Sequence, residues 1–146
     1  MNEFENPVLQ VLDAYKKAVY DRDIEAFMRL YDPAVRIFDT WGVWMYEGAA
    51  AWRKMAEGWF SSLGSERVRV TVEDLAVIGS SDMILATAVL RFAGLSAEGV
   101  ELRFLQNRLT LVLKPKGNDW TIVHEHTSSP IAFDHMKAVL HRDKSD

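Results

Sequence analysis

The sequence contains no cysteine, no long apolar run and no excess of basic residues. Without cysteine the chain can form no disulfide, thiol nucleophile or cysteine-bound metal site. No apolar run approaches the roughly 18 residues that a membrane-spanning helix requires. The acidic first residues, MNEFENPVLQ, lack the basic and apolar regions of a signal peptide. The formal net charge of -4, without a basic stripe, is atypical of nucleic-acid binding. We therefore expect a cytoplasmic protein with neither a membrane nor a nucleic acid as partner.

What the sequence does contain is typical of a single globular domain. Of its 146 residues, 49% are hydrophobic and 26% are charged, which is enough to bury a core. No repeat, linker or low-complexity segment divides the chain, so we expect one domain over residues 1–146. Its core should span about residues 7–130, followed by a C-terminal tail over 131–146 that could form a short last helix.

The first half of the chain predicts three helices. Behind Asn6-Pro7, apolar residues recur with the spacing of one buried helix face: Val8, Val11, Leu12, Tyr15, Ala18 and Val19. Asp23 can cap a second, short helix whose inner face reaches Tyr31 and which Asp32-Pro33 should end. A third helix is expected over about 49–63.

The remainder of the chain predicts strands. The residues AVRIFD, 34–39, should form the first, and an aromatic loop or short hairpin follows over 40–48. Four long strands, joined by short turns, are expected over about 66–79, 83–94, 100–114 and 119–128. Closely spaced strands of this kind indicate an antiparallel meander. We therefore expect an α+β domain whose three N-terminal helices pack on a strongly curved, mainly antiparallel sheet and leave a cone-shaped pocket.

The strands over about 83–92 and 100–113 carry apolar residues at both parities, and therefore on both faces of the expected sheet. Helices would cover one face and leave the other open. We therefore expect a homodimer in which a second copy covers the open face.

Three stretches carry a family resemblance: DRDIEAFMRLYDPAVRIFD, YEGAAAWRKM and WTIVHEHTSSP. Over about residues 7–130 the chain resembles the superfamily named after nuclear transport factor 2. This superfamily includes ketosteroid isomerase, the SnoaL-type polyketide cyclases, scytalone dehydratase and the association domain of calcium/calmodulin-dependent protein kinase II. The last stretch looks most like the SnoaL-like branch nearest the association domain. The resemblance implies the cone-shaped fold, whereas the superfamily hosts many activities.

Asp39 and Tyr15 are candidate catalytic residues. Asp39 ends the first expected strand beside a tryptophan-rich segment, and exclusion of water would raise its pKa toward the range useful for proton transfer. The resemblance to ketosteroid isomerase implies that Asp39 is a general base and that Tyr15 donates to an oxyanion. The alternatives are an Asp39 that bonds nearby turn N–H groups and a Tyr15 that is ordinary core.

Ketosteroid isomerase also uses a protonated aspartate as an oxyanion donor. That aspartate has no counterpart here, because this chain has Asn107 or Arg108 at the matching place. Neighbouring strand residues face opposite sides, and the register stays open at this point. Either side chain could donate a hydrogen bond to an anion. An inward Arg108, paired with Asp39 or Glu125, would favour an anionic ligand, while an outward Arg108 would be an ordinary surface arginine.

The stretch DWTIVHEHTSSP places His124 and His126 two residues apart. On a regular strand they share one face with Trp120, Ile122 and Ser128. The His-x-His spacing occurs in strand-borne metal sites, but no companion ligand motif is present, so we expect no metal. We expect the histidine pair to close the polar end of the pocket and to move a proton or stabilise an anion, unless both are merely core and rim residues.

The aromatic residues are too numerous for an ordinary core of this size, although a purely packed core is the alternative. Four of the five tryptophans fall between residues 41 and 59. We expect an apolar, small-molecule cavity with these ligand-contacting aromatic residues: Phe38, Trp41, Trp44, Tyr46, Trp52, Trp59 and Phe104.

These observations favour a protein that binds a small apolar or anionic organic molecule. It would be a cofactor-independent isomerase, cyclase or dehydratase that transfers a proton on a carbonyl or carboxylate compound. The alternative is a non-catalytic dimerisation or association module with a vestigial pocket. The substrate does not follow from the sequence.

Overall fold

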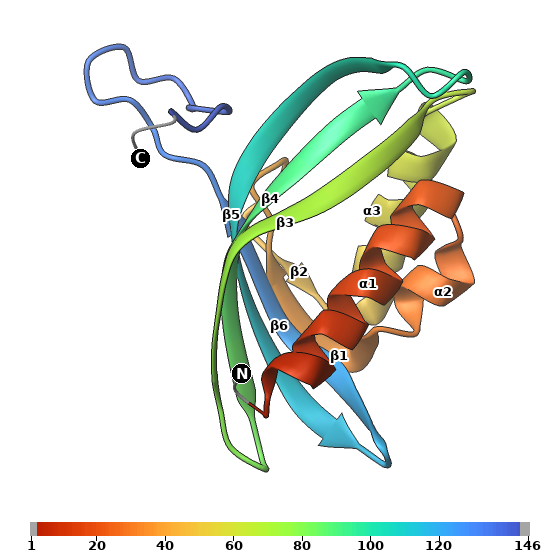
Figure 1. Cartoon of the computed structure of the whole chain (residues 1–146), viewed down its shortest axis with the longest axis vertical. Coiled ribbons are helices and arrows are strands. Elements are labelled where there is room, and N and C mark those ends of the chain that lie inside the picture. Colours follow the sequence, from red (N-terminus) through yellow and green to blue (C-terminus); the bar gives the residue numbers. More distant parts are fainter. Residues whose placement is uncertain (1–2, 144–146) are drawn as a thin grey trace.

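The computed structural model describes residues 3–143 and confirms the expected α+β fold. The helices are α1 (Glu5–Asp21), α2 (Ile24–Met28) and α3 (Ala49–Ser62). The strands are β1 (Tyr31–Phe38), β2 (Tyr46–Glu47), β3 (Arg67–Gly79), β4 (Ile84–Leu95), β5 (Glu101–Lys116) and β6 (Asp119–Ser128). Figure 1 shows the helices on one side of the sheet and the C-terminal tail on the other. Within residues 3–143, no helix is long and apolar enough to cross a membrane.

The six strands form one sheet in the order β2-β1-β6-β5-β4-β3. All neighbouring pairs are antiparallel except β1 and β6, which run parallel with Phe38 opposite His126. Because parallel strands end at the same edge, the residues that follow β1 lie beside the last residues of β6. This parallel pair therefore brings Asp39 next to Thr127.

The helices bury the apolar faces that the sequence predicts. The stripe of α1, including Tyr15, is buried against the inner face of the sheet, and Asp23 caps α2 by accepting a 3.0 Å hydrogen bond from the Ala26 N–H. The expected end of α2 is wrong: the helix stops at Met28, and Tyr31 and Pro33 belong to β1. Pro33 is tolerated because it lies where the β1–β6 register is interrupted, between residues 31 and 36.

A β-bulge in β6 changes which side chains face inward. Leu113 pairs with Ile122, but the preceding Val112 pairs with His124, so Val123 is an extra residue. The bulge reverses the alternation, placing Glu125 and Thr127 on the inner face and His124 on the outer face. The expectation that both histidines share a face with Ile122 is therefore wrong.

The tail forms an irregular hairpin rather than the expected short helix. Ile131 and Ala138 make an isolated antiparallel bridge, and Met136 adopts a left-handed backbone conformation with φ of 59°. The tail then returns to the sheet, where the Gln106 N–H donates a 2.7 Å hydrogen bond to the Leu140 carbonyl. Residues 144–146 of the expected tail lie outside the described residues.

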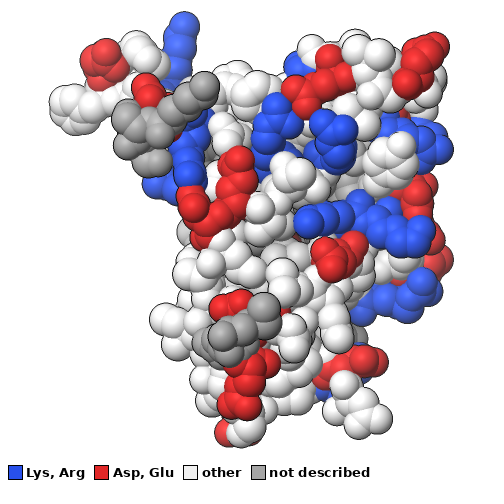
Figure 2. All heavy atoms as spheres, in the orientation of Figure 1, with Lys and Arg blue, Asp and Glu red and all other residues white. Residues whose placement is uncertain are grey.

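On the face shown in Figure 2, acidic and basic side chains are interspersed rather than separated.

Candidate functional site

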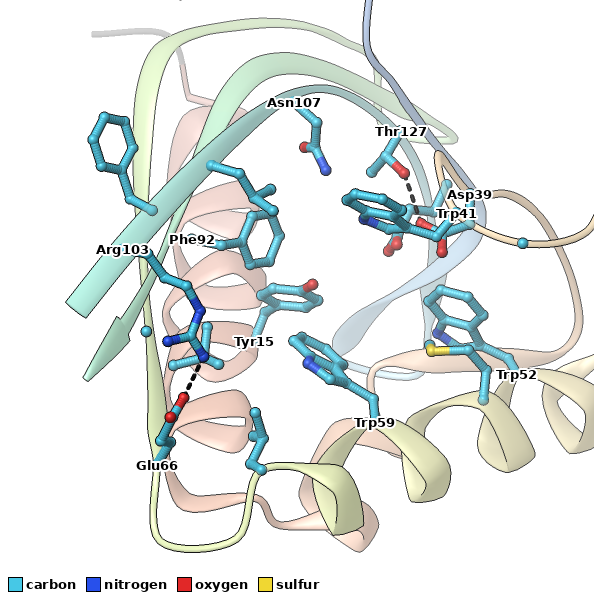
Figure 3. A pocket seen from close by; sticks show the side chains of 18 of the residues that line it. Tyr15, Asp39, Trp41, Trp52, Trp59, Glu66, Phe92, Arg103, Asn107 and Thr127 are labelled. Carbon is cyan, nitrogen blue, oxygen red and sulfur yellow. Dashed lines mark hydrogen bonds and ion pairs between the residues drawn. The ribbon is translucent and has the colours of Figure 1, made fainter. Parts of the chain in front are cut away.

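A cavity of about 570 Å³ lies between the helices and the inner face of the sheet (Figure 3). The structure places four of the aromatic residues singled out in the sequence on its wall: Trp41, Tyr46, Trp52 and Trp59. The Tyr46 and Trp52 ring centroids are 5.1 Å apart in an edge-to-face contact, and Trp59 makes a similar contact with Phe92 at 6.3 Å. Trp41 is half-exposed. The cavity is therefore largely apolar, with aromatic walls.

One side of the cavity carries a cluster of polar groups, and we call this the polar end. It consists of Tyr15, Asp39, Asn107, Glu125 and Thr127. These residues come from α1, the end of β1, β5 and β6, so the fold brings together side chains that are far apart in the sequence. Two of the predicted catalytic residues, Asp39 and Tyr15, belong to this group.

Asp39 is held in a fixed orientation by Thr127. The Thr127 hydroxyl donates a 2.8 Å hydrogen bond to Asp39 Oδ1 and accepts a 2.9 Å bond from the Thr40 N–H. Burial raises the pKa of Asp39, whereas its hydrogen bonds from Thr127 and from the backbone at Thr40 and Trp41 act in the opposite direction. The net shift is upward, as the sequence argument expected of a desolvated carboxyl group.

Tyr15 directs its hydroxyl into the cavity. Its ring packs against Phe27, and its hydroxyl points into the enclosed space in Figure 3. Burial, together with the nearby carboxyl groups of Glu125 and Asp39, raises the pKa of Tyr15 well above its ordinary value. Tyr15 therefore stays protonated, and its O–H is available as a donor to a ligand.

Glu125, like Thr127, belongs to the polar end but was not among the site residues that the sequence predicted. It is only 3% exposed, and its Oε1 accepts a 2.7 Å hydrogen bond from the Tyr31 hydroxyl. Burial raises the pKa of Glu125 to about 7; the Asp39 charge adds to this effect and the Tyr31 bond opposes it. The sequence suggested Glu125 only as a partner for Arg108, because regular alternation in β6 would turn it away from the cavity.

The structure settles which of Asn107 and Arg108 faces inward. Asn107 is 6% exposed, lines the cavity and has an Oδ1 atom without a hydrogen-bond partner among the described residues. Arg108 lies on the outer face, where its Nε donates a 3.1 Å bond to Ser128 Oγ. The polar end therefore contains an amide and not a guanidinium group.

The histidine pair lies on the outer face and away from the cavity. The Phe38 ring packs edge-on against both His124 and His126, with ring centroids 5.2 and 5.3 Å away. His124 Nδ1 is also hydrogen-bonded to the Arg36 carbonyl at 2.6 Å. The expectation that these three residues contribute to the pocket is wrong, because the bulge in β6 turns the histidines outward and Phe38 follows the same face of β1.

Two other expected aromatic contacts are absent. Trp44 lies in the loop before β2 with 92% of its surface exposed, because nothing in the described chain packs over it. Phe104 borders the cavity, but its ring is on the outer face, where the Arg91 guanidinium lies 4.0 Å from its centroid and His141 packs against it. Neither ring is placed to contact a ligand in the cavity.

The mouth of the cavity carries an ion pair that the sequence argument did not foresee. Arg103 on β5 donates to the Glu66 carboxylate, which precedes β3 (Figure 3). Both residues line the cavity, and Arg103 is the one Lys, Arg or His among its described lining residues. Its charge is already paired with Glu66, so it does not neutralise the carboxyl groups of the polar end.

Comparison with known proteins identifies the fold. The sequence profile of the SnoaL-like domain matches residues 8–132. No curated protein matches the chain. An NTF2-like protein of unknown function from Pseudomonas putida is 23% identical, with a TM-score of 0.83 and 95% of each chain covered. A putative calcium/calmodulin-dependent protein kinase II association domain from Xanthomonas campestris is 17% identical, with a TM-score of 0.70 and coverage of 83% of this chain and 84% of that one.

A third similar structure is ActVI-ORFA from Streptomyces coelicolor, which is 14% identical. Its TM-score is 0.76, with coverage of 87% of this chain and 97% of that chain. At these identities the similarity establishes the fold, and the function has to be argued from the cavity.

Proposed function

We propose a function from the cavity itself, because the chain belongs to the SnoaL-like domain family, whose fold has no fixed chemistry. The protein binds a small, largely apolar carbonyl compound in this cavity, and Asp39 transfers a proton within that compound. The observation that carries this proposal is the Asp39 carboxyl group. It is desolvated, it has a raised pKa, and it is oriented by Thr127 at the cavity wall. These are the properties expected of a general base.

The proposed reaction needs two groups of this chain. The ionised Asp39 removes a proton from the carbon next to the carbonyl group, while the Tyr15 hydroxyl donates a hydrogen bond to the carbonyl oxygen. The electron pair of the broken C–H bond moves to that oxygen, and Tyr15 stabilises the resulting enolate. Protonated Asp39 then returns the proton to another carbon, which gives an isomerisation, or to a departing hydroxyl group, which gives a dehydration. Neither route calls for a cofactor.

The position of the charged groups favours a carbonyl compound over a carboxylate. A carboxylate at the polar end would face Asp39 and Glu125, and like charges disfavour binding. The inward arginine that would have attracted an anion is absent, because Arg108 is on the outer face. The aromatic walls suit an apolar body.

The proposal is tested by proton exchange in a model ketone. In deuterated buffer, 2-tetralone exchanges its α-protons slowly, and NMR follows the loss of their signal. We expect the wild-type protein to accelerate the exchange. The acceleration by Asp39→Asn should be at least about 100-fold smaller than that by the wild-type protein. Asp82→Asn, in the exposed turn before β4, is the matched control and should behave as wild type. Exchange no faster than in buffer, or full activity in Asp39→Asn, would contradict the proposal.

We also propose that the protein is a homodimer. Ile78 on β3 pairs in register with Leu85 on β4, and on the outer face these side chains are 73% and 37% exposed. A second copy would cover them. Native mass spectrometry should show a dimer, and Leu85→Lys should weaken it whereas Val43→Lys, in an exposed loop, should not. The alternative function, a non-catalytic association module, predicts the same dimer but no acceleration of proton exchange in 2-tetralone.

A further inference from the structure

The polar end of the cavity offers more hydrogen-bond acceptors than donors. Asp39 and Glu125 supply two carboxyl groups. Asn107 supplies an amide oxygen that is buried without a partner among the described residues. Buried polar atoms in folded proteins are normally paired, so the unpaired amide of Asn107 marks this part of the cavity wall as a ligand contact.

No positive charge of the described chain reaches this acceptor-rich end. Arg103 is at the mouth and is paired with Glu66. Arg36 pairs with Glu47 and Arg108 bonds to Ser128, both outside the cavity. Two neighbouring carboxyl groups are therefore desolvated without a basic partner, an arrangement that proteins usually avoid.

The surroundings of Glu125 reinforce this imbalance. The titratable groups that face it are Tyr15 on α1, and Tyr31 and Asp39 on or next to β1. From β4 and β5, Asn107 lines the same cavity, and the other side chains beside Glu125 are apolar: Leu90, Leu109 and Leu111. A bound cation would allow both carboxyl groups to ionise and would remove their mutual repulsion.

The cavity walls are suited to the same kind of group. Trp41, Trp52 and Trp59 line one side of the space in Figure 3. The faces of aromatic rings carry negative potential and attract organic cations, most strongly when the cation is removed from water.

We propose that the cavity selects a ligand with an apolar body and a positively charged amine, and that the amine lies at the polar end between Asp39 and Glu125. This inference rests on the proposed role of the cavity as a ligand site and specifies the charge of its substrate.

The test compares three probes with the same body and different head groups: 2-naphthylmethylamine, 2-naphthalenemethanol and 2-naphthoate. Isothermal titration calorimetry on the full chain measures their affinities. We expect the amine to bind at least about tenfold more tightly than the alcohol, with no measurable binding of the carboxylate. Between about pH 6 and pH 8 the amine affinity should rise roughly tenfold, because Glu125 must ionise to receive it.

Two variants separate the effect of Glu125 from general disturbance. Glu125→Gln keeps the size of the side chain, so alcohol binding should persist and report an intact cavity. The preference for the amine should fall to within about twofold, and its pH dependence should disappear. Glu98→Gln removes a carboxylate from the exposed turn between β4 and β5, away from the cavity, and should leave the preference unchanged.

Three results would overturn the inference: an amine that binds no more tightly than the alcohol, a carboxylate that binds best, or an unchanged preference in Glu125→Gln. Each is distinguishable from failure of the proposed function. Exchange of 2-tetralone protons by Asp39 would survive all three, whereas loss of that exchange with a retained amine preference would leave a binding protein for organic cations.

Discussion

The hydroxyl of Tyr31 donates a 2.7 Å hydrogen bond to Glu125 Oε1 in the buried base of the cavity. Tyr31 begins β1 and Glu125 lies near the end of β6, so the bond depends on the parallel pairing of these strands. Tyr31 also packs against Phe27 and Trp52. The bond therefore connects the aromatic core to the polar end, and its removal should affect both stability and ionisation.

We expect Tyr31→Phe to destabilise the protein more at high pH than at low pH. Its hydroxyl favours the ionised form of Glu125, so its loss raises the pKa of Glu125 further. The ionised carboxylate would then lack its donor, at a cost of about 1–3 kcal/mol. Urea unfolding at about pH 5 and pH 8 measures this difference. Tyr20→Phe, on the exposed side of α1, is the control, and equal effects of both variants would contradict the prediction.

Glu125→Gln should stabilise the protein above neutral pH. The carboxyl pKa is about 7 in the folded protein against an ordinary value of 4.5. Between these values the unfolded chain loses a proton that the folded chain keeps, so stability falls as pH rises and then levels off above about pH 7. The loss amounts to about 3 kcal/mol at most. The variant avoids it, so urea unfolding should show similar stabilities at about pH 4 and a more stable variant at about pH 8. Parallel pH profiles would contradict this prediction.

Much of this arrangement could be predicted from the sequence. The helical spacing of α1 placed Tyr15 on a buried face, and the end of the first strand placed Asp39 beside the tryptophan-rich segment. Both predictions rest on regular periodicity, which local sequence specifies well. The choice between Asn107 and Arg108 required the strand register, which is determined by pairing between distant segments.

The bulge at Val123 explains the main error in the predicted site. One extra residue reverses the faces of everything that follows it, so the histidines and Glu125 exchange sides. Nothing within β6 marks the bulge, because it arises from the match between β5 and β6. Trp44 was misplaced for a different reason: it lies in a loop, where periodicity carries no information about burial.

Thr127→Val should slow the exchange of 2-tetralone protons without abolishing it. The Thr127 hydroxyl orients Asp39 and lowers its pKa by a 2.8 Å hydrogen bond. Without it, the pKa of Asp39 rises and the exchange profile shifts to higher pH, with a rate reduced about tenfold at neutral pH. Thr110→Val is the matched control, since Thr110 lies on the outer face of the neighbouring strand opposite His126. If the pH profile of the exchange rate does not shift in this variant, Thr127 does not act through Asp39.

Tyr15→Phe should reduce ketone exchange by about 100-fold while leaving the pH profile of Asp39 nearly unchanged, because the hydroxyl stabilises the enolate and does not carry the abstracted proton. Binding of 2-naphthalenemethanol reports whether the cavity is intact. If exchange is lost together with alcohol binding, Tyr15 has a packing role. If exchange is retained, another group stabilises the oxyanion.

The histidine pair provides the sharpest contrast between the sequence argument and the structure. On a regular strand, His124 and His126 would face the cavity, and replacing both with alanine would abolish exchange. In the folded protein they lie on the outer face around Phe38. We therefore expect the double variant to exchange 2-tetralone protons within about twofold of the wild-type rate. The same substitutions should weaken the dimer if a second copy covers the outer face, and native mass spectrometry measures that. A monomer that still catalyses exchange would assign the histidines to assembly, whereas a dimer without exchange would restore them to the catalytic site.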